Sequence, residues 1–410
     1  MRKLIARGAH AAVISAGILA CSQAALADPA AAPTAADAVP AAVPSPGVNL
    51  DVGAVKVTVG GFIETAAIFR NKNEEADVGS NYNNIPFPDT PLGNMDEFRM
   101  SARQSRLSLL AKGPEDGPNK VSAYYEMDFL GAATTSNSNE SNSYNPRIRH
   151  VYLTYSNTDT GFNVVAGQTW SLVTLSKNGL MPQQQFTPLT IDAQYVPGFN
   201  WTRAPQLRLV EKFSDMLSAG FSIETPQATY KGTVPAGTTS TGTGNASGGA
   251  QMNSGTTYSV DDVPDLVAKV AVDPGFGHYE VYALGREFTD RIGSTAGGSP
   301  QNSHALGGGF GFGAVLPVVP KLIDVQLSGL AGKGIGRYGS GQLPDATYNS
   351  NGSPHPIAGM QGLLGVIGHP TDRLDVYAYA GDEAINSTGG WGDGTSGAGT
   401  PASWEAQATS

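Results

Sequence analysis

The stretch Val121–Phe129, VSAYYEMDF, places two acidic residues among apolar ones. Successive side chains of a β-strand point to opposite faces, so this alternation gives one oily row and one polar row. Glu126 and Asp128 belong to the polar row, and Met127 and Phe129 belong to the oily row. Such a strand fits a soluble protein with an acid pair in its cleft. It also fits a membrane-spanning strand whose acids face a water-filled lumen.

The N-terminus has the features of a secretory signal peptide. Basic residues precede an apolar run, and Ala25-Leu26-Ala27 suits the cleaving peptidase. The run Ile18-Leu19-Ala20-Cys21 imitates a lipoprotein site only loosely, because Leu19 is poor there. We expect residues 1–27 to be removed on export. Cys21 is the only cysteine, so the mature chain has no thiol for a disulfide, a nucleophile or a zinc-thiolate site.

Charge and hydropathy restrict the partners of the mature chain. Without Arg2, Lys3 and Arg7 the 25 basic residues fall to 22 against 35 acidic ones, a net charge of −13. Nucleic acid is therefore an unsuitable partner. No later apolar run reaches the roughly 18 to 20 residues of a transmembrane helix, so any contact with lipid must come from strands. Residues 28–48 are rich in Ala and Pro and are typical of a linker.

From Val55 onward the period-2 pattern predicts strands throughout, joined by connections that alternate in length. The expected strands cover 55–70, 99–112, 120–130, 147–156, 162–170, 203–212, 216–225, 265–272, 278–288, 304–316, 322–332, 360–368 and 373–381, and another starts near Trp404. The long connections are 71–98, 131–146, 171–202, 226–264, 289–303, 333–359 and 382–403. In an up-and-down antiparallel sheet all long loops then lie at one end, as in outer-membrane barrels.

These observations predict an all-β fold, a transmembrane antiparallel up-and-down β-barrel over residues 49–410. The oily row of the opening stretch then faces lipid, and Glu126 and Asp128 face the lumen. An open sheet in hydrocarbon leaves backbone groups unpaired, so the barrel must close. Because the chain stops at Ser410, early in its last expected strand, we expect it to be C-terminally incomplete.

The competing interpretation is a secreted soluble β-sandwich that binds or hydrolyses glycans. Glu126-Met-Asp128-Phe resembles the strand motif of laminarinase-type glycoside hydrolases, in which alternating acids perform catalysis. That motif requires a third acid, but Leu130 and Gly131 follow here. No other catalytic motif is present, and the histidines are scattered without metal-ligand spacing. We therefore expect no enzymatic activity, no catalytic residue, no metal and no cofactor.

Strand parity also places basic side chains in the lumen. Arg106, Arg208, Lys269 and Arg286 point inward together with Tyr152, whereas Arg149 and Arg203 point outward unless a bulge intervenes or the rim lies above the lipid. An arginine row in a narrow pore attracts small anions. The same arginines can instead pair with Glu126, Asp128 and other lumen acids and brace the wall. The residues alone leave both roles open.

Six short motifs occur in an order that resembles the DcaP-type porins of Gram-negative bacteria. They are Arg103-Gln-Ser-Arg-Leu, Pro146-Arg-Ile-Arg-His-Val-Tyr, Ala166-Gly-Gln-Thr-Trp, Ala204-Pro-Gln-Leu-Arg, Pro264-Asp-Leu-Val-Ala and Gly334-Ile-Gly-Arg-Tyr. The resemblance implies a barrel of 16 strands, of which about 13 to 14 fall within this chain. It also implies a homotrimer in the outer membrane, in contact with lipid and lipopolysaccharide. The function implied is transport of ions and small anionic solutes such as dicarboxylates by passive diffusion.

The resemblance further implies that the third long loop, 171–202, folds inward and narrows the pore. The loop is oilier than a segment in water should be, which favours packing inside the barrel. We expect Met181, Gln184, Phe186 and Tyr195 to form the constriction. Residues 28–48 lack the heptads of the helical N-terminal segment that such porins can carry.

Overall fold

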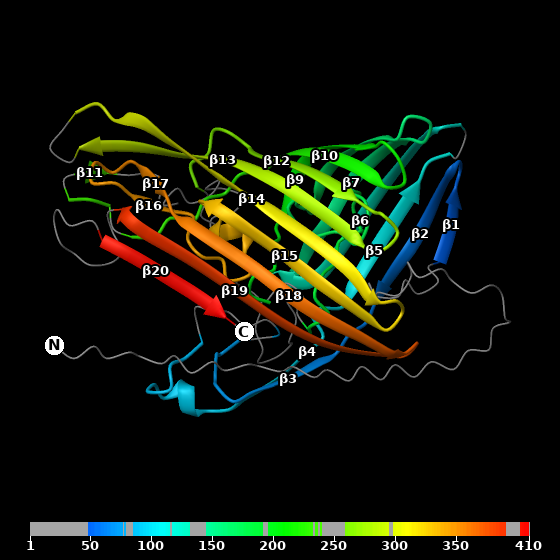
Figure 1. The fold of residues 1–410 in the computed structure, drawn as a ribbon, viewed down its shortest axis with the longest axis horizontal. Coiled ribbons are helices and arrows are strands. Elements are labelled where there is room, and N and C mark those ends of the chain that lie inside the picture. Colours follow the sequence, from blue (N-terminus) through cyan, green and yellow to red (C-terminus); the bar gives the residue numbers. More distant parts are fainter. Residues whose placement is uncertain are drawn as a thin grey trace.

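A single large antiparallel sheet forms most of the computed structural model (Figure 1). The structure describes residues 48–76, 78, 85–114, 117–131, 145–191, 196–232, 234–236, 238–239, 259–294, 298–390 and 402–409. The expected signal peptide and nearly all of the Ala/Pro-rich linker lie outside these residues. No helix in the described part of the chain is long and apolar enough to cross a membrane.

The sheet has 16 strands in the order β1-β2-β5-β6-β7-β8-β9-β10-β12-β13-β14-β15-β18-β19-β20, with β11 paired to β13. Its strands are β1 (Val48–Val52), β2 (Val55–Phe62), β5 (Arg106–Lys112), β6 (Asn119–Gly131), β7 (Asn145–Asn157), β8 (Phe162–Trp170), β9 (Arg203–Lys212), β10 (Leu217–Glu224), β11 (Thr238–Thr239), β12 (Asp265–Val272), β13 (His278–Ser294), β14 (Gln301–Val319), β15 (Ile323–Lys333), β18 (Ala358–Thr371), β19 (Leu374–Gly390) and β20 (Ala402–Thr409). Each strand pairs with the next one along this order, which is the up-and-down topology expected from the sequence.

Two small sheets lie off this path. The strands β3 (Ala66–Arg70) and β4 (Glu97–Ser101) pair with each other, as do β16 (Ala346–Tyr348) and β17 (Pro354–Pro356). Short 3-10 helices occur at η2 (Leu92–Asn94) and η3 (Gly336–Tyr338). The expected strand 55–70 is divided into β2 and β3, and the expected strand 99–112 is divided into β4 and β5. Gly61 has φ 139° at the end of β2, and its backbone lies too close to the Arg106 carbonyl to admit a side chain.

The connections alternate in length as expected. Tight turns join β5 to β6, β7 to β8, β9 to β10, β12 to β13, β14 to β15 and β18 to β19. Long connections follow β3, β6, β8, β10, β15 and β19. The link between β13 and β14 is shorter than expected. β13 continues past residue 288 to Ser294, and β14 begins before residue 304, at Gln301. All long loops therefore gather at one end of the sheet, opposite the tight turns.

The two faces of the sheet differ in polarity. Leu153 and Val281 are exposed on the outer face, whereas the neighbouring Tyr152 and Tyr282 are buried on the inner face. β9 repeats this pattern, with Leu207 exposed between the buried Gln206 and Arg208, and Leu209 exposed between the buried Arg208 and Val210. Period-2 alternation gives each strand one apolar side and one polar side. The apolar side is the outer one, which is the arrangement of a membrane barrel and the reverse of a soluble sandwich.

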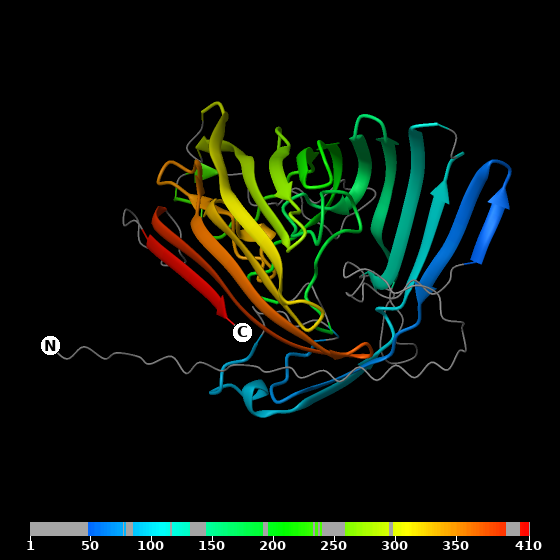
Figure 2. The same ribbon diagram turned by 45° about the vertical axis from the view of Figure 1, so that its right-hand side comes forward.

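The sheet curls into an arch whose inside is filled by chain from the long loops (Figure 2). Leu172, Val173 and Leu180 of the loop 171–202 pack with Tyr338 of the loop 334–357 and with inward-facing residues of the sheet such as Leu330. Among the described residues, β1 and β20 are the two ends of the strand order, and no ladder joins them. The buried core thus lies within the curve of one sheet rather than between two sheets.

Candidate functional site

A bulge in β7 determines where Arg149 points. The register pairs Glu126 with His150 but Met127 with Ile148, so Arg149 is an extra residue on its strand. An extra residue re-aims its side chain and shifts the alternation that follows. Arg149 is accordingly buried on the inner face, against the simple parity of the sequence. The bulge is one of the two exceptions that the sequence analysis allowed.

The acids of the opening stretch face Arg149. Its Nε donates to Glu126 Oε1 at 2.6 Å, and its Nη1 donates to Asp128 Oδ2 at 3.1 Å. Arg147 binds Asp128 through two nitrogens, at 3.0 and 2.6 Å, which is the bidentate geometry that makes such pairs strong. Arg106 Nη1 lies 3.7 Å from Glu126 Oε1. These acids are held by arginines on the inner face, an arrangement unlike the free acid pair of a glycoside hydrolase.

Arg203 joins this group through aromatic contacts. Its guanidinium lies over the rings of Trp170, at 5.0 Å, and Trp201, at 5.6 Å, which is cation–π geometry. It lies opposite Trp170 in the β8–β9 register, and it is within electrostatic range of Arg147 and Arg149. Parity would turn Arg203 outward, yet its guanidinium lies over Trp170, whose ring is 5.9 Å from that of the buried His150.

We call Arg106, Arg147, Arg149 and Arg203 the arginine wall. These four cations lie among three carboxylates, Glu126, Asp128 and Glu64, so positive charge is in excess. Tyr124 and Tyr152 lie beside it with ring centroids 5.7 Å apart, and the Tyr124 hydroxyl donates to Glu126. Arg147 and Arg106 keep about a third and a quarter of their side-chain surface accessible, at 34% and 25%.

The loop 171–202, which we call the inward segment, is fixed to the inner face of the sheet. Lys269 Nζ donates to the Thr174 carbonyl at 3.0 Å, and Arg208 Nη1 donates to the Leu180 carbonyl at 3.0 Å. Three carboxylates accept from its backbone amides: Glu224 from Leu172 at 2.9 Å, Glu280 from Ser176 at 3.2 Å and Asp273 from Gly179 at 3.0 Å. Side chains of β9, β10, β12 and β13 and of the turn after β12 thus hold the first half of the segment.

The second half reaches the opposite arm of the arch. Gln326 donates to the Phe186 carbonyl at 3.2 Å, and the hydroxyl of Tyr379 accepts from the Leu189 amide at 3.1 Å. Glu383 of β19 accepts from the Gly198 amide at 2.8 Å. The segment therefore crosses the interior from β8 to β19. Phe186 is buried, Met181 and Gln184 are half-buried, and Tyr195 lies outside the described residues.

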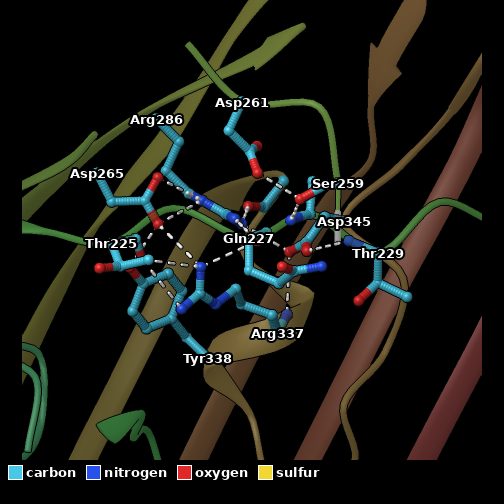
Figure 3. Close-up of polar contacts among 12 residues, drawn as sticks. Thr225, Gln227, Thr229, Ser259, Asp261, Asp265, Arg286, Arg337, Tyr338 and Asp345 are labelled. Atoms are coloured by element: carbon cyan, nitrogen blue, oxygen red, sulfur yellow. Dashed lines mark hydrogen bonds and ion pairs between the residues drawn. The ribbon is translucent and has the colours of Figure 1, made fainter. Parts of the chain in front are cut away.

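A second loop, 334–357, is held inside by a compact charge network (Figure 3). Arg286 pairs with Asp265 at 3.1 Å and with Asp345 at 2.7 Å. Arg337 adds a contact to Asp265 at 3.5 Å, and the Tyr338 hydroxyl donates to the same carboxylate at 2.8 Å. Burial, together with Asp265, raises the pKa of Tyr338 well above its usual value, so this hydroxyl remains a donor.

The predicted pore residues therefore fall into two groups. Arg106, Arg149 and Arg203 lie with Glu126, Asp128 and Tyr152 on the inner face of the wall from β5 to β9. Arg208, Lys269 and Arg286 point inward as parity required, but they are only 1%, 2% and 4% exposed and hold loops or carboxylates. The sequence analysis did not single out Trp170 and Trp201 as site residues, although Trp170 stands in one of the quoted motifs.

Comparisons with known proteins agree with this architecture. No protein-family model and no curated protein matches the chain. The crystal structure of the outer membrane channel DcaP of Acinetobacter baumannii is similar over 81% of this chain and 86% of its own, with 20% identity and a TM-score of 0.58. The chain has the fold of a DcaP-type outer-membrane porin. Its apolar outer face suits lipid, which is consistent with an outer-membrane location.

Two further solved structures are more distant. An anion-selective porin from Comamonas acidovorans matches over 87% of this chain and 97% of its own, at 12% identity and a TM-score of 0.37. The trimer form of the Vibrio cholerae outer membrane protein OmpT matches over 87% and 100%, at 10% identity and a TM-score of 0.37.

Proposed function

We propose that this chain is a porin of the outer membrane that lets small anionic solutes, dicarboxylate-like in charge, diffuse through a water-filled lumen. The observation that carries the proposal is the arginine wall. Arg106, Arg147 and Arg149 pair with the two carboxylates, Arg203 lies within electrostatic range of Arg147, Arg149 and Asp128, and the side chains of Arg106 and Arg147 are partly accessible. Guanidinium is always charged and binds carboxylates through paired hydrogen bonds, so the excess positive charge attracts small carboxylates.

The inward segment supports a narrowed path. It crosses the interior on hydrogen bonds to β9, β13 and β19, and the loop 334–357 packs beside it. Together these loops occupy the side of the lumen where Arg208, Lys269 and Arg286 lie. The free path then runs along the opposite side, past the arginine wall. This assigns solute selection to Arg106, Arg147, Arg149 and Arg203 and gives the other three cations a structural role.

A homotrimer in contact with lipid and lipopolysaccharide completes the proposal. The β3–β4 hairpin carries Phe69, Phe98 and Met100 on one exposed face, beyond what a surface in water requires. Either lipid or a neighbouring subunit can cover such a face. In a trimer each insertion into a bilayer adds three equal conductance steps.

Planar-bilayer recording tests selectivity and assembly together. In a salt gradient we expect the reversal potential of the wild type to show a preference for anions. We expect each inserted trimer to close in three equal conductance steps. Arg203→Gln should lower the anion-to-cation permeability ratio, because it removes one of the four cations of the wall. Arg373→Gln, in the exposed turn between β18 and β19, is the matched control and should change little. A cation-selective wild type would overturn the anion proposal, whereas single conductance steps would overturn only the trimer.

A further inference from the structure

Three potential metal ligands from different segments meet on the outer surface of the sheet. They are Asp262 before β12, Glu287 of β13 and His304 of β14. The β13–β14 register pairs Thr289 with His304 and Glu287 with Leu306, so Glu287 and His304 are diagonal neighbours on one face. Leu306, the next residue of that face, is 78% exposed. The cluster therefore faces away from the lumen and from the solute path proposed above.

Both carboxylates converge on one ring nitrogen. His304 Nδ1 lies 2.9 Å from Glu287 Oε1, 3.3 Å from Thr289 Oγ1 and 3.8 Å from Asp262 Oδ2, and the three ligand atoms lie within 4.8 Å of one another. The hydroxyl of Thr289 donates to the other oxygen of Asp262, Oδ1, which orients that carboxylate. An outer hydrogen bond that fixes a carboxylate in this way is a regular feature of metal sites.

Two other histidines show what a purely hydrogen-bonded arrangement looks like in the described chain. Each of them also has two carboxylate neighbours, but each ring nitrogen faces its own carboxylate. His278 contacts Asp273 through Nδ1 at 2.7 Å and Glu280 through Nε2 at 3.1 Å, and His369 contacts Asp375 through Nδ1 at 2.6 Å and Asp324 through Nε2 at 3.3 Å. A protonated imidazole satisfies both partners in that geometry, because each nitrogen carries one proton.

The His304 cluster is arranged differently, because both carboxylates lie on the side of the same nitrogen. Nδ1 carries at most one proton, so it can donate to Glu287 while Asp262 accepts from Thr289, and the two carboxylates remain close together. Two carboxylates held close together repel each other unless a cation lies between them. Ligand atoms bound to Zn²⁺ at 2.0–2.2 Å in a tetrahedron lie roughly 3.3 Å apart. The observed separations of 2.9 and 3.8 Å straddle that value.

We propose that Asp262, Glu287 and His304 bind a divalent transition-metal ion of the zinc class. Imidazole with two carboxylates suits Zn²⁺ better than Mg²⁺ or Ca²⁺, which prefer oxygen ligands alone. The side chains are 50%, 21% and 44% exposed. His304 is the fourth residue of β14 and Asp262 lies in the long connection before β12, so the cluster is at the loop end of the sheet, where an ion can reach it from water and keep a position for a water molecule. The bound ion fastens the segment before β12 to the β13–β14 hairpin. Sequence spacing did not reveal this site, because 25 and 17 positions separate its ligands.

Calorimetric titration tests the site. The full-length, tag-free protein in detergent is first treated with a chelator to remove bound metal and is then titrated with Zn²⁺. We expect one saturable Zn²⁺ per chain, with binding that persists in excess Mg²⁺ and Ca²⁺. His304→Ala and the isosteric Glu287→Gln should each weaken binding at least about tenfold, since removing even an outer-shell partner costs that much. His369→Ala is the matched control, because it also removes a histidine with two carboxylate neighbours. It should bind Zn²⁺ as the wild type does.

Heat-modifiable migration on gels shows that each variant is folded before it is titrated. Absence of saturable Zn²⁺ binding by the folded wild type would overturn the proposal. Equal binding by the wild type and a folded Glu287→Gln or His304→Ala variant would also overturn it. Zn²⁺ should raise the unfolding temperature of the wild type and of His369→Ala but not that of His304→Ala. None of these results depends on whether the pore selects anions.

Discussion

At the scale of single residues, the inner face of the sheet uses its arginines in two different ways. Arg208 and Arg286 are buried and bind loop carbonyls or carboxylates. Arg147 is partly accessible and shares Asp128 with Arg149. A buried cation with its partners in place is structural, because breaking such a pair leaves an unpaired charge in a low-dielectric site. Only the partly accessible group retains charge that a passing solute can meet.

Glu126→Gln should increase anion preference. Glu126 accepts from Arg149 at 2.6 Å and lies 3.7 Å from Arg106, so its charge offsets part of the wall. Removing that charge increases the excess of positive charge in the wall by one, while the amide oxygen still accepts from Arg149. We expect the reversal potential in a salt gradient to shift from the wild-type value toward that of a channel permeable only to anions. Asp159→Asn in the exposed β7–β8 turn is the control, and an equal shift in both variants would contradict a local effect of the wall.

At the scale of elements, the inward segment is a long stretch of irregular chain that side chains of the sheet hold by its backbone. Its backbone amides are bound by Glu224, Glu280 and Asp273, and its carbonyls by Lys269 and Arg208. Irregular backbone inside a barrel requires such partners, because each unsatisfied buried group costs about 1–3 kcal/mol. The charged inner faces of neighbouring strands supply them.

Deleting Gly179–Thr187 should raise the single-channel conductance. The deletion removes the contacts to Asp273, Arg208 and Gln326 together with the buried ring of Phe186, so chain is lost from the middle of the lumen. Deleting the exposed link 298–300 between β13 and β14 is the control and should leave conductance unchanged. Conductance equal to that of the wild type after the first deletion would show that the segment does not restrict the path.

At the scale of the whole molecule, stability depends on which face of the sheet meets which solvent. Exposed large apolar residues of the strands, such as Leu153, Val281 and Phe310, share the outer face. Burying them in lipid is favourable, and burying polar residues there is costly. The inner face carries the polar network and the loops. The sheet is thus the reverse of a soluble protein, with its apolar surface outside.

Leu153→Arg and Thr154→Arg should have opposite consequences although they are adjacent. Leu153 is 57% exposed on the outer face, so an arginine there enters the hydrocarbon and costs about 2–4 kcal/mol near the midplane. Thr154 lies on the inner face, where charged residues are common, so its substitution should cost far less. Reversible unfolding in urea from lipid bilayers measures both. Equal costs for the two variants would contradict the assignment of faces.

The sequence by itself determined the topology and the assignment of faces. Strict alternation in stretches such as Val121–Phe129 marked the strands, and the ends of β8, β9 and β12 lie where the pattern put them. Alternating connection lengths gave the up-and-down order. These properties are local, since the period of 2 and the turn chemistry act within a few residues.

Whether an inward-facing side chain is buried against a loop or remains accessible depends on tertiary contacts. The bulge at Arg149 depends on the register between two strands. Lys269 is buried because it binds the carbonyl of Thr174, which lies 95 positions earlier in the sequence. The cluster of Asp262, Glu287 and His304 likewise exists only because the segment before β12 lies close to the paired strands β13 and β14. Contacts between segments distant in sequence leave no periodic signal in either segment, so parity gave the face of each side chain but not its partner.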